Sequence, residues 1–72
     1  MNKIQQKHQE MIKFELNLNP NQSLTDLYKS LRKREKELFC CRETLVRNLA
    51  FMEYDGYLIT KRIDNKIYVE VV

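Results

Sequence analysis

Two patterns of apolar and polar positions meet near the start of the chain. Residues 2–11 are mostly polar and compatible with a helix, whereas residues 12–19 have the sequence IKFELNLN, in which apolar and polar side chains alternate. Alternation with a period of two is typical of a strand with one buried face. Two structures therefore stay open for residues 1–19. One is a helix to about residue 15 followed by a short strand, and the other is a loose arm followed by a longer strand.

A helical pattern follows a turn signal at residues 19–21, whose sequence is NPN. Ser23 and Asp26 have the spacing of a capping box, in which two side chains satisfy free amides at the start of a helix. The apolar residues that come next recur at helical spacing and predict a second helix over residues 23–38. A charge run at residues 32–37 also allows this helix to break and restart.

A third apolar pattern predicts a helix over residues 42–55, because Leu45, Leu49 and Met52 recur at i, i+4 and i+7. Gly56 comes directly after it, and glycine readily adopts the left-handed conformation that ends many helices. The sequence therefore predicts a well-defined end to this helix and a sharp change of chain direction behind it.

Residues 57–72 predict a β-hairpin, since they are rich in β-branched and aromatic side chains. Residues 64–65 are Asp-Asn, a pair that tolerates the positive φ angles of a tight two-residue turn. Alternation along both strands places one set of side chains on the face expected to cover the helices: Leu58, Thr60, Ile67, Val69 and Val71. The pattern as a whole predicts an α+β fold, with helices packed on a C-terminal antiparallel sheet of two or three strands.

Positive charge is concentrated in two segments of this 72-residue chain, although its formal net charge is only +3. Residues 29–47 carry seven basic and three acidic side chains, and residues 61–66 carry three basic side chains and one acidic. Such clustering is expected for a polyanionic partner, although solvation of helix surfaces explains it equally well on charge alone. Within the first segment, Lys33, Arg34 and Lys36 are expected to form a solvated face.

The cysteine and histidine positions predict neither a disulfide nor a metal site. Cys40 and Cys41 are adjacent, and neighbouring cysteines rarely bridge each other because the geometry is strained. His8 is too far along the chain to complete a zinc site with them. Cys40 is expected in the core, whereas Cys41 lies near a helix start, where a thiolate would be favoured; a redox switch at this pair is a minority alternative.

Several classes of protein are excluded by what the sequence lacks. It shows no nucleophile–base pair, carboxylate dyad, metal cluster or phosphate-binding loop, so we expect neither an enzyme nor a bound cofactor nor a small-molecule ligand. It also shows no signal peptide and no apolar run long enough to cross a membrane. We therefore expect a reduced, cytoplasmic protein.

Residues 41–62, with the sequence CRETLVRNLAFMEYDGYLITKR, resemble the recognition helix and wing of winged helix-turn-helix regulators from bacteria, phages and plasmids. The matching positions are Cys41, Arg42, Thr44, Leu45, Leu49, Met52, Glu53, Gly56, Tyr57 and Leu58. The stretch SLTDLYKSL at residues 23–31 is similar to the helix before the recognition helix, so the resemblance covers residues 20–72. PNQSL and ETLVRNL are also similar to GntR-type domains, although no effector domain is visible. The resemblance implies one winged-helix domain over residues 1–72, with a recognition helix at 42–55 and a wing at 57–72.

Three features depart from the pattern of that superfamily. The segment 31–41 is several residues longer than the usual turn between the two helices. Cys41 is a poor N-cap compared with the small polar residue usually found there. Val46, Ala50 and Phe51 stand where polar side chains are usual, so the helix is unusually apolar and contacts to protein as well as DNA stay open.

The resemblance implies that the N-terminal half of the recognition helix enters the major groove of DNA. The residues implied to face bases are Arg42, Glu43, Val46 and Arg47, with Thr44 and Asn48 at the margin. In the wing, the residues implied to lie against phosphate or in the minor groove are Lys61, Arg62, Asn65 and Lys66. Each assignment has a plainer alternative. Arg42 and Arg47 would be solvated or paired with Glu43, and the hairpin tip would be an ordinary charged turn that discourages pairing of sheet edges.

The function implied by the resemblance is sequence-specific binding of double-stranded DNA by a small transcriptional regulator or a plasmid or phage accessory factor. The alternative is a winged-helix module for protein contact, such as an inhibitor or assembly factor, without specific DNA binding. The apolar excess of the recognition helix and the net charge of only +3 motivate this alternative. Phe51 and Tyr54 would either pack beneath the N-terminal segment or form a dimer surface, so a homodimer or a protein partner stays open.

Overall fold

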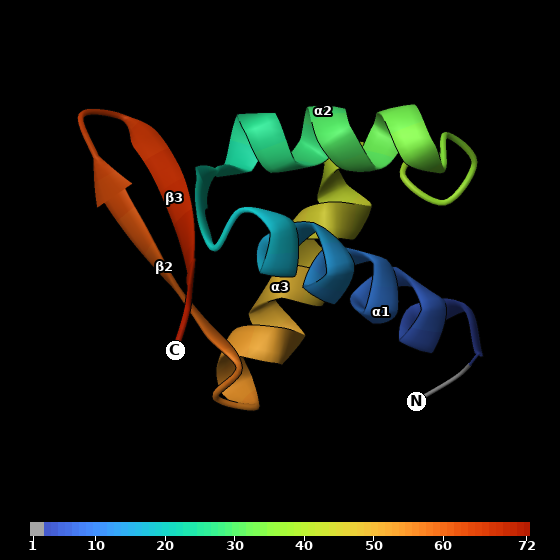
Figure 1. The fold of residues 1–72 in the computed structure, drawn as a ribbon, viewed down its shortest axis with the longest axis horizontal. Coiled ribbons are helices and arrows are strands. Elements are labelled where there is room, and N and C mark those ends of the chain that lie inside the picture. Colours follow the sequence, from blue (N-terminus) through green and yellow to red (C-terminus); the bar gives the residue numbers. More distant parts are fainter. Residues whose placement is uncertain (1–2) are drawn as a thin grey trace.

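The computed structural model describes residues 3–72, which form three helices and one antiparallel sheet of three strands. The helices lie on one side of a long hairpin (Figure 1). In chain order the elements are α1 (Lys3–Leu18), β1 (Asn21–Ser23), α2 (Leu24–Arg34), α3 (Arg42–Tyr54), β2 (Leu58–Ile63) and β3 (Lys66–Val71). The fold is therefore α+β, with an element order compatible with a winged helix. Residues 1 and 2 of the predicted N-terminal segment lie outside the described residues.

The first helix resolves the conflict in the N-terminal pattern. α1 continues to Leu18, so a strand within residues 12–19 is wrong. Ile12 and Leu16 are fully buried, one helical turn apart, whereas Phe14 and Leu18 are exposed. Burial thus follows the helical repeat and not the alternation, because only the residues that face α2 and α3 enter the core.

The short strand instead comes after the turn, at β1. It pairs with β3 in an antiparallel register, with Gln22 opposite Val69, and makes β3 the central strand in the order β1-β3-β2. The side-chain amide of Gln22 also donates to the backbone carbonyl of Asn19 at 3.0 Å, which holds the turn before β1. A strand of three residues has no periodicity to detect, and its partner lies at the far end of the chain.

The second helix begins as predicted but ends four residues early. The hydroxyl of Ser23 accepts a hydrogen bond from the amide of Asp26 at 3.1 Å, so Ser23 is the N-cap. The helix ends at Arg34 and not at residue 38, because the chain turns back to bury Phe39 completely. Phe39 takes the core position expected for its neighbour Cys40, which is exposed, so that prediction is wrong.

A contact from α1 fixes this loop between α2 and α3. The imidazole Nε2 of His8 donates to the backbone carbonyl of Leu38 at 2.8 Å. The same ring meets Phe39 edge-on, with 5.2 Å between ring centroids. His8 is therefore a buried structural residue that ties α1 to the segment leading into α3.

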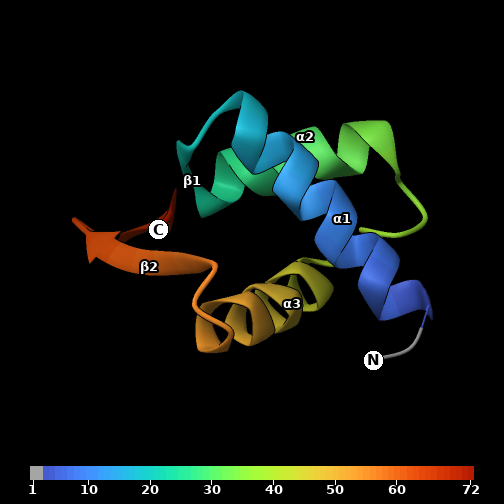
Figure 2. The same cartoon turned by 60° about the horizontal axis from the view of Figure 1, so that its bottom comes forward.

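The junction between α3 and β2 positions the hairpin. Gly56 has φ +82°, and its amide donates to the carbonyl of Glu53 while the amide of Tyr57 donates to the carbonyl of Met52. This pair of bonds closes the helix end in a Schellman motif and redirects the chain. β2 consequently begins just after the C-terminal end of α3 (Figure 2), and the two elements are in contact.

The hairpin has the predicted turn and the predicted faces. Asp64 and Asn65 adopt φ values of 48° and 67°, as the tight two-residue turn requires. Leu58 and Val69 are fully buried on the face that meets the helices, while Ile63 is exposed on the other face. The core that results is formed by Ile12, Leu16, Leu24, Leu27, Leu31, Phe39, Leu45, Leu49, Met52, Leu58 and Val69.

Candidate nucleic-acid interface

The outer face of α3 is the first component of the candidate site. The helical repeat places Glu43, Arg47, Ala50 and Tyr54 along one line, and all four are exposed. The carboxylate of Glu43 lies 3.9 Å from the guanidinium of Arg47, one turn away. Exposed ion pairs of this kind contribute little stability, so Arg47 can leave Glu43 for a stronger anionic partner.

The other predicted positions at the start and middle of α3 differ in accessibility. Arg42 is exposed, and its guanidinium reaches back to the hydroxyl of Thr25 at the start of α2, 3.5 Å away. Thr44 is half-buried, and Asn48 retains only 4% of its exposure. The amide nitrogen of Asn48 donates to the carbonyl of Thr44, so Asn48 belongs to the interior and not to the margin of a DNA-facing surface.

Three apolar or aromatic residues on the outer side of α3 are accessible. Val46 and Phe51 are both exposed, and Tyr54 retains 91% of its exposure. The expectation that Phe51 and Tyr54 pack beneath the N-terminal segment is therefore wrong. These side chains give α3 an apolar outer surface next to the charged one.

The hairpin tip supplies the second component. Lys61, Arg62, Asn65 and Lys66 are all exposed. The ammonium of Lys61 pairs with a carboxylate oxygen of Glu70 at 3.0 Å, on the sheet face that points away from the helices. Arg62 lies opposite Ile67 and shares with it the face that meets α3. Two adjacent cations therefore point to opposite faces, and only Arg62 lies on the α3 side.

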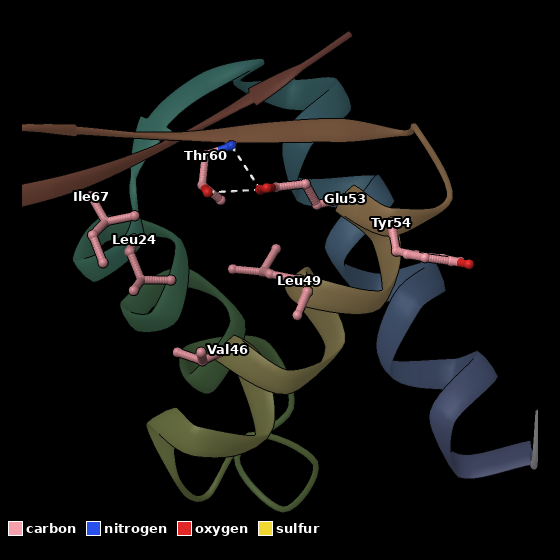
Figure 3. Close-up of a pocket in the computed structure, with 8 residues that line it drawn as sticks. Leu24, Val46, Leu49, Glu53, Tyr54, Thr60 and Ile67 are labelled. Carbon is pink, nitrogen blue, oxygen red and sulfur yellow. Dashed lines mark hydrogen bonds between the residues drawn. The ribbon is translucent and has the colours of Figure 1, made fainter.

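A groove separates these two components (Figure 3). It has a volume of about 560 Å³ and is lined by Leu24, Val46, Leu49, Ala50, Glu53, Tyr54, Thr60 and Ile67. Most of these side chains are apolar, and Glu53 is the one acidic residue among them. One oxygen of Glu53 accepts hydrogen bonds from both the backbone amide and the hydroxyl of Thr60.

Sequence reasoning missed the groove. It arises because β2 is in contact with α3, and neither pattern alone shows that juxtaposition. The exposed apolar positions Val46 and Ala50 were its one visible signal, since they stand where polar residues are usual.

Cys41 is the N-cap of α3 and has an exposed thiol. The hydroxyl of Thr44 lies 3.2 Å from its sulfur. Hydrogen bonding from Thr44 lowers the pKa of the Cys41 thiol below its ordinary value, with a smaller contribution from the backbone at the helix start. Cys40 and Cys41 are both free thiols, and a redox role for the pair stays a prediction.

Two further observations concern residues 3–72, the part of the chain that the structure describes. Within this range no helix is long and apolar enough to cross a membrane. The same range contains no group of three or more His, Cys, Asp or Glu side chains arranged to hold a metal ion. No protein-family model, curated protein or solved structure matches the chain.

Proposed function

We propose that this chain is a winged helix-turn-helix protein that binds double-stranded DNA sequence-specifically, as a small transcriptional regulator or a plasmid or phage accessory factor. The order α1-β1-α2-α3-β2-β3, with β3 central in the sheet, supports the fold assignment. In that fold α3 is the recognition helix and the β2–β3 hairpin is the wing.

One arrangement supports the proposal: α3 and the β2–β3 hairpin are in contact, and each carries an exposed arginine. Arg47 is on the outer line of α3, and Arg62 is on the wing face that meets α3. α3 has 13 residues and is therefore about 20 Å long. The major groove of DNA is wide enough to admit an α-helix. A duplex can then contact the helix and the wing together.

The roles of the side chains follow from their chemistry. Arg47 has the planar donor geometry that reads guanine through O6 and N7, and Val46 can contact a thymine methyl group. Arg62 and Lys66 suit phosphate or the minor groove. Glu43 can accept from the amino group of cytosine once Arg47 has left it.

The test begins with selection of bound duplexes from a random library. Affinity is then measured by fluorescence anisotropy, for the selected duplex and for a scrambled one, over a range of salt concentrations. Arg47→Ala should weaken binding to the selected duplex by about 10- to 100-fold and leave scrambled DNA nearly unchanged. Lys66→Ala should weaken binding to the selected and the scrambled duplex to a similar degree. It should also reduce, by about one, the slope of the logarithm of the binding constant against the logarithm of the salt concentration.

The matched control is Arg32→Ala, which removes an exposed arginine from α2 outside the proposed interface. It should change neither affinity. If the wild-type chain binds no duplex even at low salt, the proposal is wrong. If Arg47→Ala weakens selected and scrambled DNA equally, base reading by α3 is wrong.

The groove between α3 and the wing favours a second function, a winged-helix module for protein contact. Its walls are mostly apolar, and Glu53 places a negative charge where a phosphate would be repelled. A protein partner with apolar and basic side chains fits this chemistry better than DNA does. Failure to bind any duplex, together with loss of a protein contact in Val46→Glu, would support this function over the first.

A further inference from the structure

The groove between α3 and the hairpin is lined by one face of α3. The lining residues of this face follow the helical spacing i, i+3, i+4 and i+7: Val46, Leu49, Ala50 and Glu53. Leu24 and Leu49 are buried and form its floor, while Ile67 of β3 and Thr60 of β2 face them (Figure 3). The ring of Tyr54 points away from these side chains. The walls are therefore apolar except where Glu53 meets Thr60.

Glu53 presents a fixed carboxylate to this groove. Its Oε1 atom accepts from the backbone amide of Thr60 at 3.0 Å and from the hydroxyl at 2.7 Å, and no described residue donates to Oε2. Within residues 3–72 the carboxylates that pair with a cation are those of Glu15, Glu43 and Glu70. The carboxylate of Glu53 is thus held in place without a cation, and one of its oxygens is open to an incoming donor.

The chemistry of the groove selects one kind of ligand. Its apolar walls favour a hydrocarbon body, and its one open carboxylate oxygen favours a positively charged N–H donor. A polycation would leave its other charges without partners. A metal ion needs several ligands, and residues 3–72 contain no group of three or more His, Cys, Asp or Glu side chains that could hold one. An organic molecule with a single ammonium group meets both requirements.

The size of the groove favours a small molecule over a segment of protein. Its volume of about 560 Å³ is within the range of ligand pockets, about 300–1,000 Å³. An α-helix about 10 Å across occupies roughly 80 Å³ per ångström of its length, so this volume holds little more than one turn. An extended peptide would bring backbone amides and carbonyls that apolar walls cannot satisfy. A protein can place one side chain here, whereas a small molecule fills the groove.

We propose that the groove is a binding site for a small organic cation with an apolar body and one ammonium group. The body lies against Leu24, Leu49 and Ile67, and the ammonium donates to Oε2 of Glu53. No small-molecule ligand was expected from the sequence, because no local motif shows a groove assembled from separate elements. The ligand lies between the two elements proposed above to bind DNA, but the inference does not rest on that proposal.

The test titrates the full chain, without DNA, with probes that share a hydrocarbon body and differ in the head group. One set is naphthylmethylamine, naphthylmethanol and naphthoic acid, and a second set has the same three head groups on a cyclohexyl body. Amide chemical shifts in NMR spectra measure affinity and show where each probe binds.

The shifts should concentrate on the parts of α3, β2 and β3 that line the groove. The amines should bind with dissociation constants on the order of 0.1–1 mM. They should bind at least about threefold more tightly than the matched alcohols, and the acids should bind most weakly, because an exposed carboxylate attracts a cation only modestly and repels an anion.

Glu53→Gln is the decisive variant, because the glutamine oxygen still accepts from Thr60 while the charge is lost. It should bind the amines no better than the alcohols and should bind the alcohols as the wild-type chain does. Ala50→Leu narrows the groove and should weaken binding of amines and alcohols by a similar factor. Glu53 and Ala50 are both exposed, so circular dichroism should show an intact fold.

Glu10→Gln is the matched control, because it removes one negative charge from an exposed glutamate of α1 outside the groove. It should keep the preference for amines. The proposal is overturned if no probe shifts the groove amides, if amines and alcohols bind the wild-type chain equally, or if the preference for amines survives in Glu53→Gln.

Two further measurements address other occupants of the groove. If its amides shift when the concentration of the chain alone is raised, a second copy occupies it and the proposal is wrong. Acetyl-lysine methylamide, with a free side-chain ammonium, represents a lysine of a partner protein. If this probe binds more tightly than cyclohexylmethylamine, the groove belongs to a protein side chain and the proposal is also wrong.

Discussion

A single carboxylate oxygen of Glu53 on α3 accepts two hydrogen bonds from Thr60 on β2, at 3.0 Å from the backbone amide and 2.7 Å from the hydroxyl. This pair of bonds fixes the hairpin beside the helix. Thr60→Val removes the hydroxyl donor and keeps the β-branched shape, so it should lower the free energy of unfolding by about 1 kcal/mol. Urea denaturation followed by circular dichroism measures this change.

Thr60→Ser is the control for this bond, because it keeps both donors. It should lose less stability than Thr60→Val, despite the weaker preference of serine for a strand. Equal losses in the two variants would show that the hydroxyl of Thr60 contributes nothing to the attachment of β2.

The ion pair between Glu15 of α1 and Arg34 of α2 is the next testable contact. Glu15 is buried, and the guanidinium of Arg34 both pairs with its carboxylate and lies over Phe14. Arg34→Met leaves a buried carboxylate without its cation, which should cost about 1–2 kcal/mol, less than for a fully buried pair because Arg34 is half-exposed. Of the residues predicted to form a solvated face, Lys33, Arg34 and Lys36, Arg34 is exposed but also pairs with a buried carboxylate.

Chemical denaturation of Arg34→Met and Arg32→Met in parallel tests this pair. Arg32 is an exposed arginine of the same helix, so its replacement controls for the loss of one positive charge. Arg34→Lys should recover only part of the loss, because lysine lacks the planar group that both pairs and stacks. Identical stabilities for the two methionine variants would contradict the expected contribution of the ion pair.

The elements that the sequence predicted well are those with local chemical signals. The end of α3 and the hairpin turn each depend on residues that tolerate positive φ, Gly56 in one case and residues 64–65 in the other. Their conformational preferences act within a few residues, so a single sequence reveals them. The assignment of hairpin side chains to the two faces of the sheet is also correct, because alternation along a strand is a local pattern.

The elements that the sequence did not predict depend on distant contacts. β1 exists because β3 lies beside it, and α2 ends early because Phe39 must reach the core. In the site, the resemblance implied that Arg47 faces bases and that Asn48 lies at the margin; Arg47 is exposed, whereas Asn48 is buried. The groove beside Glu53 needs two elements to be placed together before it can be recognised.

Asn65 has two potential roles that one substitution can separate. Its φ of 67° makes it part of the tight turn, and it was also predicted to contact DNA. Asn65→Gly removes the side chain but favours this backbone conformation, so stability should be unchanged or rise slightly. Asn65→Ala should lose about 1 kcal/mol, because alanine lacks the short polar side chain with which asparagine tolerates positive φ.

Duplex binding by these two variants gives the second measurement. If Asn65 acts only through the turn, Asn65→Gly should bind the selected duplex as well as the wild-type chain does. A loss of affinity in Asn65→Gly with full stability would instead assign the side chain a direct contact.

Substitutions at two adjacent positions on α3, Arg47 and Asn48, should have different effects on stability and on DNA binding. Asn48 is buried, and its amide donates to the carbonyl of Thr44, whereas its neighbour Arg47 is exposed. Asn48→Asp removes the donor and buries a negative charge, so it should lower the free energy of unfolding by at least about 2 kcal/mol. Arg47→Ala should change stability by less than about 0.5 kcal/mol. Thermal unfolding of both variants measures the contrast, and comparable losses would contradict the burial of Asn48.

The pH dependence of Cys41 reactivity tests the hydrogen bond from Thr44. Because the pKa of the Cys41 thiol is lowered in the folded chain, the thiolate forms at a lower pH than in the unfolded chain. In a Cys40→Ser background, alkylation by iodoacetamide should therefore reach half of its maximal rate at a lower pH when the chain is folded than when it is unfolded in urea. Thr44→Val should move this midpoint upward, and Thr44→Ser should retain most of the shift.

The same lowered pKa makes a prediction about stability. The hydrogen bond favours the thiolate of Cys41. Its contribution to the free energy of unfolding is therefore fully present above the pKa of this thiol in the unfolded chain, and it is lost as pH falls through the pKa in the folded chain. The stability difference between the wild-type chain and Thr44→Val should therefore widen as pH rises through that window. A midpoint that does not move in Thr44→Val, together with a stability difference independent of pH, would show that the backbone at the helix start lowers the pKa without help from Thr44.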